Sequence, residues 1–205
     1  MHASGLTASG RMSADVADHC AWRGDSVLWL NASRKASFPG AAAIDNAVGE
    51  LCKELDLQLR ARGQMALSTR HDAQLSFYPG DGALGFIKHY DTKDVRTSGR
   101  KITLLTYLNP PDWCHGGQLV IYPPDDGRPC TVEPTAGTVV VLCSDVMHEV
   151  LPSTESRVAL TVWVDGCLLD KHACYVPLTA APCGAYELEQ EDKRSIWRRF
   201  MSWLW

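Results

Sequence analysis

The stretch FIKHYDTKDVRTSGRKITLLTYLN, residues 86–109, places a histidine and an aspartate two positions apart at the end of an apolar run. Residues i and i+2 of a strand point to the same face of a sheet. His89 and Asp91 are therefore expected to bind one ligand together. Further along, SDVMHEVLPSTESRVALTVW supplies His148 at the mouth of another strand-like run and Arg157 at the start of the next.

Two histidines and one carboxylate form the facial triad that binds non-haem Fe(II) and leaves three coordination positions open. The sequence therefore predicts an iron site formed by His89, Asp91 and His148. The open positions suit a 2-oxo acid, whose distal carboxylate needs a bidentate cation that Arg157 can supply. Thr161 shares a strand face with Arg157, and Tyr107 is placed to share the carboxylate. The H-E-x-x-H pattern of zincins is absent.

Short strand-like runs broken by Gly, Pro and Asp fill residues 65–165. This pattern favours a β-sandwich or barrel, with a jelly roll as a good candidate. Upstream, apolar residues at a 3.6-residue period over 41–62 predict an amphipathic helix that packs on the core, with Gly63 as its stop. Residues 31–40 contain Ser, Pro and Gly and predict a linker. The predicted fold class is therefore mainly β with flanking helices.

One domain is expected over residues 21–182. Residues 1–20 are small and polar without periodicity and predict a flexible leader. Residues 183–205 end in a Trp-rich amphipathic segment with basic residues around its apolar face. Two interpretations of this tail stay open: a terminal helix docked on the barrel, or a helix that binds a membrane surface or a partner groove.

The composition argues against several classes of protein. A net charge of −4 and a pI near 5.9 provide no basic footprint for nucleic acid, so a protein or small-molecule partner is favoured. The 8 cysteines include no C-x-x-C pair, which argues against a zinc ribbon. No stretch has the ~20 apolar residues of a membrane span and no signal-peptide-like run is found, so the cytoplasm is the expected location, with the nucleus as the alternative.

Several further motifs accompany the four site side chains. RGDSVLW, YPGDG, GRKITLLTYLN, GGQLVIYP and VEP occur in this order, and HEV and RVALTVW surround the distal histidine and the arginine. Over roughly residues 22–165 the chain resembles the Fe(II)/2-oxoglutarate-dependent prolyl 4-hydroxylases of the oxygen-sensing branch, which act on hypoxia-inducible factor. One departure is HYDTKD, where the animal enzymes read H-x-D-N-P, so the loop 92–99 is this chain's own.

The resemblance implies a double-stranded β-helix, or jelly roll, and a role for each matched residue. The triad residues would bind iron, with no catalytic residue beyond these ligands. Arg157 and Tyr107 would bind the distal carboxylate of 2-oxoglutarate. Further residues would line the co-substrate pocket: Tyr78, Thr161, Leu75, Leu105, Leu119, Val150 and Trp163.

A substrate loop is also implied, formed by Arg23, Asp25 and Arg100, in which Asp25 pairs with Arg100 over the bound peptide. Basic residues cluster near the expected edge of the groove and predict a preference for a peptide with acidic residues beside the proline. These basic residues are Lys93, Arg96, Arg100 and Lys101.

The implied activity is protein prolyl 4-hydroxylation, which uses Fe(II), O2 and 2-oxoglutarate and releases succinate and CO2. Oxygen sensing is the implied setting, ascorbate an optional further cofactor and a monomer the expected state. The implied substrates are a protein like hypoxia-inducible factor, a ubiquitin-ligase adaptor or a translation protein. Two alternatives stay open: a non-catalytic sensor or scaffold domain, and a nucleic-acid dealkylase. Trp163 argues against the dealkylase, because those enzymes have a second arginine at this position.

Overall fold

The computed structural model of this chain describes residues 8–9, 22–37, 39–124 and 127–169. The predicted tail, 183–205, and all but two residues of the predicted leader lie outside this part, so the domain boundaries remain predictions. Within the described part, every helix is too short or too polar to span a bilayer.

The larger of two antiparallel sheets has 7 strands. They span Ala8–Ser9 (β1), Ser26–Leu30 (β2), Met65–Arg70 (β3), Ala73–Tyr78 (β4), Arg100–Tyr107 (β6), Val139–Cys143 (β9) and Arg157–Leu168 (β11). Their order is β1-β2-β4-β11-β6-β9, and β3 pairs along the end of β11. Strand β6 is buried from Lys101 to Tyr107, because one face of the sheet packs on a helix and the other on the second sheet.

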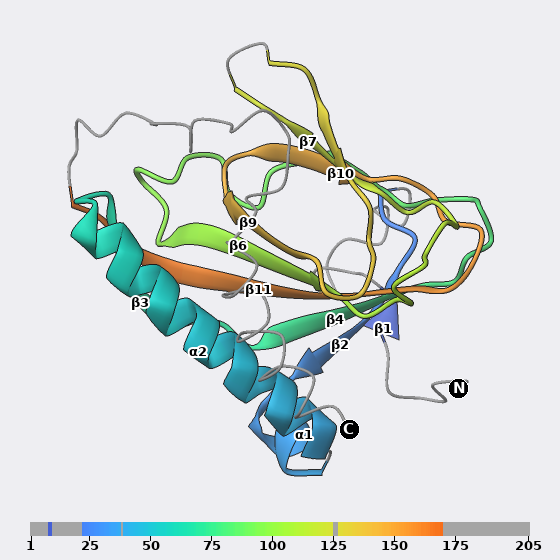
Figure 1. Ribbon diagram of the computed structural model, residues 1–205, viewed down its shortest axis with the longest axis horizontal. Helices are drawn as coiled ribbons and strands as arrows, with labels where there is room; N and C mark the ends of the chain where they lie inside the picture. Colours follow the sequence, from blue (N-terminus) through green and yellow to red (C-terminus); the bar gives the residue numbers. More distant parts are fainter. Residues whose placement is uncertain (1–7, 10–21, 38, 125–126, 170–205) are drawn as a thin grey trace.

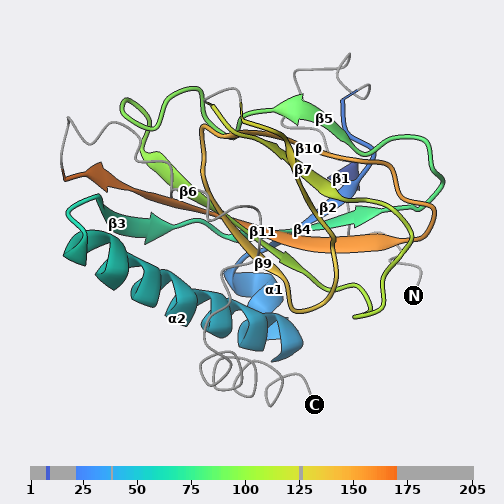
Figure 2. The ribbon, with the colours of Figure 1, turned by 45° about the horizontal axis from the view of Figure 1, so that its top comes forward.

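The smaller sheet has 4 strands and covers one face of the larger sheet (Figures 1 and 2). The strands span Phe86–His89 (β5), Leu119–Tyr122 (β7), Cys130–Val132 (β8) and Met147–Val150 (β10). Their order is β5-β10-β7-β8, so strands distant in the sequence lie side by side. Two facing antiparallel sheets with this crossed order form a jelly roll, and the predicted fold class is confirmed.

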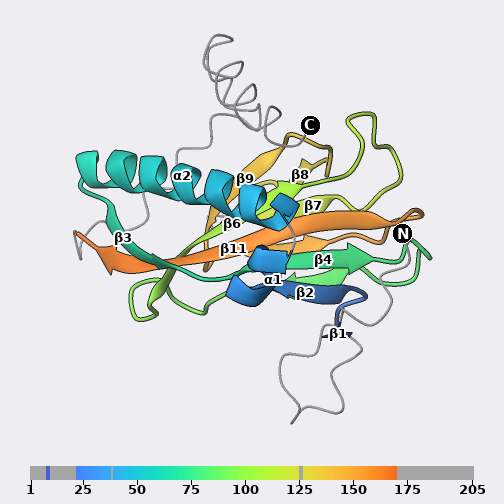
Figure 3. The same ribbon diagram turned by 90° about the horizontal axis from the view of Figure 1, so that it is seen from below.

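Helix α2, Pro39–Ala61, packs on the face of the larger sheet that points away from the smaller sheet (Figures 2 and 3). Its apolar stripe, including Val48 and Leu59, joins the core of that face. Gly63 has a φ of 68°, and its N–H donates to the Arg60 carbonyl at 2.9 Å, which closes the helix end. The predicted amphipathic helix and its glycine stop are confirmed.

The predicted linker over residues 31–40 is wrong in part, because Ala32–Ser37 forms the short helix α1. The N–H of Lys35 donates to the Asn31 carbonyl at 3.0 Å, and Lys35 Nζ lies 3.3 Å from an Asp45 carboxylate oxygen on α2. A helix of 6 residues is not stable by itself. The contact with α2 therefore stabilises a helix that is too short to be stable by itself.

The core consists of two apolar clusters on opposite faces of the larger sheet. Leu104 and Val162 belong to the cluster under α2, whereas Leu105, Leu119 and Val150 belong to the cluster between the two sheets. Adjacent residues of β6 enter different clusters because side chains alternate along a strand. The side chains predicted to form the functional site lie beside the second cluster, where the inner faces of the two sheets meet.

Candidate metal centre

The two predicted metal-binding histidines lie on neighbouring strands. His89 ends β5 and is directly opposite His148 on β10. Phe86 is opposite Val150, so three steps along β5 match two steps along β10, which is a β-bulge. The bulge brings Phe86 and His89 to the same side, and their rings stack with centroids 3.6 Å apart.

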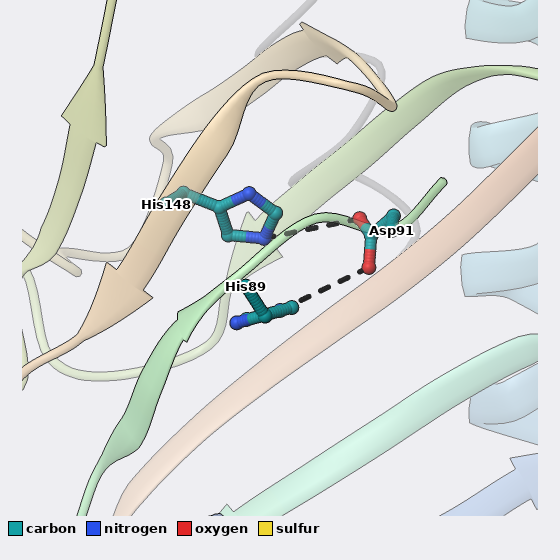
Figure 4. Close-up of side chains that lie close together, drawn as sticks. All are labelled: His89, Asp91 and His148. Atoms are coloured by element: carbon teal, nitrogen blue, oxygen red, sulfur yellow. Dashed lines mark ion pairs between the residues drawn. The ribbon is translucent and has the colours of Figure 1, made fainter. Parts of the chain in front are cut away.

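The structure brings the three predicted metal ligands together (Figure 4). Asp91 lies in the turn after β5, with one carboxylate oxygen 3.9 Å from His89 Nε2 and the other 3.8 Å from His148 Nε2. One donor atom from each residue lies within 4.8 Å of the other two. Among the described residues, no other group of three His, Cys, Asp or Glu side chains comes this close.

Backbone carbonyls determine which imidazole nitrogen faces the centre. His89 Nδ1 lies 2.8 Å from the Ile87 carbonyl, and His148 Nδ1 lies 2.9 Å from the Val146 carbonyl. A carbonyl only accepts, so each Nδ1 carries the proton and donates it. In a neutral ring the Nε2 lone pair is then available to a metal.

The protonation state of His89 suits a metal ligand. The pKa of His89 is lowered to about 4, first by burial and then by the neighbouring His148. The ring is therefore neutral near pH 7, as a ligand must be. Two imidazole nitrogens and one carboxylate fit the ligand preference of Fe(II).

Asp91 is held at two points that sequence reasoning missed. Thr103 Oγ1 donates to Asp91 Oδ2 at 2.7 Å, and Ser144 Oγ lies 2.9 Å from Thr103 Oγ1. Arg100 Nη1 donates to the Asp91 carbonyl at 3.0 Å. Thr103 and Tyr107 are an even number of positions apart and therefore share a strand face, and this pattern could have identified Thr103 from the sequence. No comparable signal in the sequence indicated Ser144.

Arg157 and Tyr107 are both 1 % exposed on the inner face. Arg157 Nε donates to the Gly117 carbonyl at 2.8 Å. Its Nη2 atom and the Tyr107 hydroxyl oxygen are buried and have no hydrogen-bond partner. Burying such groups unpaired is costly, so this pair fits an anionic ligand with two oxygens, such as the distal carboxylate of 2-oxoglutarate.

The surroundings keep these groups in their donating forms. Burial raises the pKa of Tyr107 to about 12 and also raises that of Tyr78, so both phenols stay protonated at neutral pH. Tyr78 lies under the guanidinium, with Arg157 Cζ 4.9 Å from its ring centroid. A Cβ on Gly117 would lie 2.6 Å from Arg157 Cδ, so only glycine leaves room for the arginine here.

Most of the residues predicted to line the pocket lie in or beside the cluster between the two sheets. Leu105, Leu119 and Val150 pack together with the two tyrosines, and Thr161 is buried. Trp163 is directly opposite Thr103 on β6 and therefore shares its face. Leu75 is different, because it packs in the cluster under α2. It is three positions from Tyr78, and an odd separation along a strand puts two side chains on opposite faces.

The predicted pairing of Asp25 with Arg100 is wrong. Asp25 is 3 % exposed and accepts two hydrogen bonds of 2.6 Å from Arg23. Arg100 instead bonds the Asp91 carbonyl, and its Cζ lies 4.6 Å from a Trp163 ring centroid. A forked arginine two residues away gives each oxygen of the carboxylate a charged partner, so a distant arginine is not required.

Two members of the predicted basic cluster are engaged within the loop 92–99. Lys101 is 3 % exposed, and its Nζ donates to the carbonyls of Val95 and Ser98. Arg96 pairs with Asp94 at 2.9 Å. These two cations organise the loop 92–99, whereas Lys93 is exposed, and the preference for acidic peptides stays a prediction.

Comparison with known protein families and chains identifies relatives. Residues 73–165 match the 2OG-Fe(II) oxygenase superfamily. The chain is 35 % identical over 147 residues to prolyl hydroxylase EGLN3 of Mus musculus, covering 69 % of this chain and 58 % of that protein. It is 30 % identical over 173 residues to Egl nine homolog 1 of Homo sapiens, covering 80 % and 38 %. The chain thus spans less than two thirds of these relatives.

Solved structures show the same likeness. A prolyl hydroxylase from Trichoplax adhaerens, in complex with a peptide fragment of the hypoxia-inducible factor oxygen degradation domain, superposes with a TM-score of 0.60 at 28 % identity. That match covers 79 % of this chain and 71 % of the other. A Pseudomonas putida prolyl-4-hydroxylase gives a TM-score of 0.57 at 28 % identity, covering 71 % and 73 %.

Proposed function

Residues 73–165 form a domain of the 2OG-Fe(II) oxygenase superfamily, and on this premise we propose that the chain is a protein prolyl 4-hydroxylase. It would use Fe(II), 2-oxoglutarate and O2 to hydroxylate a proline of a protein substrate, releasing succinate and CO2. The observation that carries the proposal is the three-ligand centre on the smaller sheet, which lies between the same two sheets as a buried, partly unpaired Arg157 on the larger sheet.

His89, Asp91 and His148 would hold the iron. When bound, Fe(II) with 2-oxoglutarate supplies the activation of O2 that oxidises a C–H bond. The protein's own contribution is orientation. The Ile87 and Val146 carbonyls fix both imidazoles, and Thr103 fixes the carboxylate. Fixing the ligands in advance lowers the cost of ordering them when the metal binds.

Arg157 and Tyr107 would bind the distal carboxylate of 2-oxoglutarate. Arg157 Nε donates to the Gly117 carbonyl, which leaves Nη2 to donate to one carboxylate oxygen. The protonated Tyr107 hydroxyl can donate to the other. Leu105 and Leu119 exclude water from this end of the pocket, which strengthens both hydrogen bonds.

The substrate class is proposed from the relatives. The Trichoplax adhaerens enzyme was solved with a hypoxia-inducible factor peptide, and similar curated chains are named prolyl hydroxylases. We therefore place a proline-containing protein as the substrate, with an oxygen-sensing target like hypoxia-inducible factor ahead of a ubiquitin-ligase adaptor or a translation protein. A monomer in the cytoplasm or nucleus, with ascorbate as an optional reductant, completes the proposal.

Succinate release with and without proline peptides tests the activity. The purified chain is supplied with Fe(II), 2-oxoglutarate and O2, and the peptides are analysed by mass spectrometry. We expect peptide-dependent succinate, matched by the gain of one oxygen atom on proline. Equal succinate without peptide, or oxidation of an alkylated nucleotide in place of peptide, would contradict the proposal. Metal binding without any turnover would indicate a non-catalytic sensor.

A further inference from the structure

The segment 22–25 lies along the edge of the smaller sheet. Strand β5 is the edge strand of that sheet, and Arg23 forms a bridge with Phe86 on it. The Gly24 N–H donates to the Gly85 carbonyl at 2.8 Å, and the Ile87 N–H donates to the Trp22 carbonyl at 3.0 Å. The same segment continues into β2 of the larger sheet. It therefore ties the two sheets together beside a metal ligand.

Four side chains form a continuous contact that ends at this ligand. Asp25 accepts two hydrogen bonds of 2.6 Å from Arg23. The Arg23 guanidinium lies over Phe86, with Cζ 4.6 Å from the ring centroid. The Phe86 ring stacks on His89 with centroids 3.6 Å apart and an interplanar angle of 15°. Phe86 therefore has the cation near its ring and the imidazole stacked against it.

The backbone of this segment permits few alternatives. A Cβ on Gly24 would lie 2.2 Å from the Leu84 carbonyl oxygen, closer than any side chain tolerates. The side chain of Asp25 is 0 % exposed and that of Arg23 is 10 % exposed, so their ion pair is shielded from water. A buried carboxylate without its partner is costly, which holds the guanidinium in place. The Arg-Gly-Asp order thus has a local physical reason.

We propose that Arg23 and Phe86 are positioning residues for the metal ligand His89. The inference rests on the metal-binding part of the proposed function. The hydrogen bond from Nδ1 to the Ile87 carbonyl fixes one edge of the imidazole, and the stacked Phe86 ring fixes its plane. Cation–π contact with Arg23 keeps Phe86 in that position. The segment predicted to close over substrate therefore acts on the metal site.

Mn(II) titration of the complete chain tests this role, because Mn(II) avoids the oxidation of Fe(II). Phe86→Leu keeps an apolar side chain but removes the ring, and we expect about tenfold weaker Mn(II) binding, as for other residues that orient metal ligands. Phe86→Tyr keeps the ring and should retain the wild-type Mn(II) affinity. Arg23→Lys keeps a positive charge beside Asp25 but removes the flat guanidinium, and should weaken binding in the same direction.

Arg96→Lys is the matched control. Arg96 also forks to an aspartate two residues away, with bonds of 2.9 and 3.1 Å to Asp94, but on an exposed loop. Its Mn(II) affinity should equal that of the wild type. Wild-type affinity in both Phe86→Leu and Arg23→Lys would overturn the inference. Mn(II) affinity that follows the expected order in a chain that hydroxylates no peptide would overturn the proposed activity and leave this inference standing.

Discussion

At the scale of single residues, short hydrogen bonds decide what the site can bind. Asp91 is held through its carboxylate by Thr103 and through its carbonyl by Arg100. The histidines are held through Nδ1. Only the atoms needed by a metal are left facing the centre. At the other end of the pocket, the unpaired atoms of Arg157 and Tyr107 fit an anion in the same way.

Thr103→Val should weaken metal binding without changing side-chain volume much. The valine cannot donate to Asp91 Oδ2, and it also removes the partner of Ser144 Oγ. We expect about a tenfold loss of Mn(II) affinity, and a stability loss of about 1–3 kcal/mol from the unsatisfied hydroxyl of Ser144. Metal titration and urea denaturation measure the two effects.

Thr103→Ser should preserve Mn(II) affinity, because serine keeps the hydroxyl. Thr106→Val provides the control on the same strand. Thr106 is also buried, but an odd separation places it on the opposite face from Thr103. A loss of metal affinity in Thr106→Val equal to that in Thr103→Val would show that the effect is general to β6 and does not depend on the bond to Asp91.

Arg157→Lys should raise the KM for 2-oxoglutarate about tenfold or more, which corresponds to ~1.4 kcal/mol or more. A lysine keeps the charge but cannot bond the Gly117 carbonyl and a carboxylate with a rigid fork. Steady-state kinetics at varied 2-oxoglutarate, with peptide saturating, measures the change. An unchanged KM would mean that a different cation binds the co-substrate.

At the scale of elements, the periodic patterns of the sequence predicted the regular helix and strands. The 3.6-residue stripe marked α2, and the two-residue period placed Arg157 and Thr161 on one face of β11. Local exceptions were not predictable. The bulge that brings Phe86 beside His89 depends on the register between β5 and β10, which no single segment specifies. The partner of Asp25 was mistaken because a long-range pair was inferred where a neighbour two residues away was available.

Asp45 connects three elements and offers a pH-dependent test of the helix attachment. On α2, it accepts hydrogen bonds from Arg70 of β3 at 2.7 Å and from Lys35 of α1 at 3.3 Å. Burial alone would raise its pKa, but these two cations outweigh burial, so the pKa lies below its usual 3.8. The carboxylate therefore stabilises the fold above the unfolded pKa and loses this contribution as pH falls through the folded value.

Asp45→Asn should lower the free energy of unfolding by about 1 kcal/mol at pH 7. The difference between variant and wild type should shrink as the pH falls below 3.8, because the wild-type carboxylate is then protonated too. Urea denaturation across pH 3–7 measures it, with Asp94→Asn as an exposed-loop control of the same chemistry. A difference independent of pH would show that shape, and not charge, explains the effect.

At the scale of the whole molecule, the metal ligands are distinct from the residues of the two apolar cores, whereas Tyr107, beside Arg157, belongs to the cluster between the sheets. The cluster under α2 and the cluster between the sheets hold the fold by apolar contact, while the metal ligands lie on β5, on β10 and in the turn after β5. The pattern of the sequence could predict the sheets, the helix and the order of the ligands. It could not predict the segment 22–25 as a tie between the two sheets, because that depends on the assembled edge.

Asp91→Ala should therefore abolish 2-oxoglutarate turnover while leaving the fold intact. The change removes one of three ligands and one hydrogen bond from Thr103, so we expect the free energy of unfolding to change by no more than about 1.5 kcal/mol. Leu119→Ala, at a position that is 0 % exposed in the cluster between the sheets, should cost about 2–5 kcal/mol. Urea denaturation of both metal-free variants, with circular dichroism as the readout, compares them directly. Full turnover in Asp91→Ala would reject the facial triad, whereas a stability loss as large as that of Leu119→Ala would mean that the centre is part of the structural core.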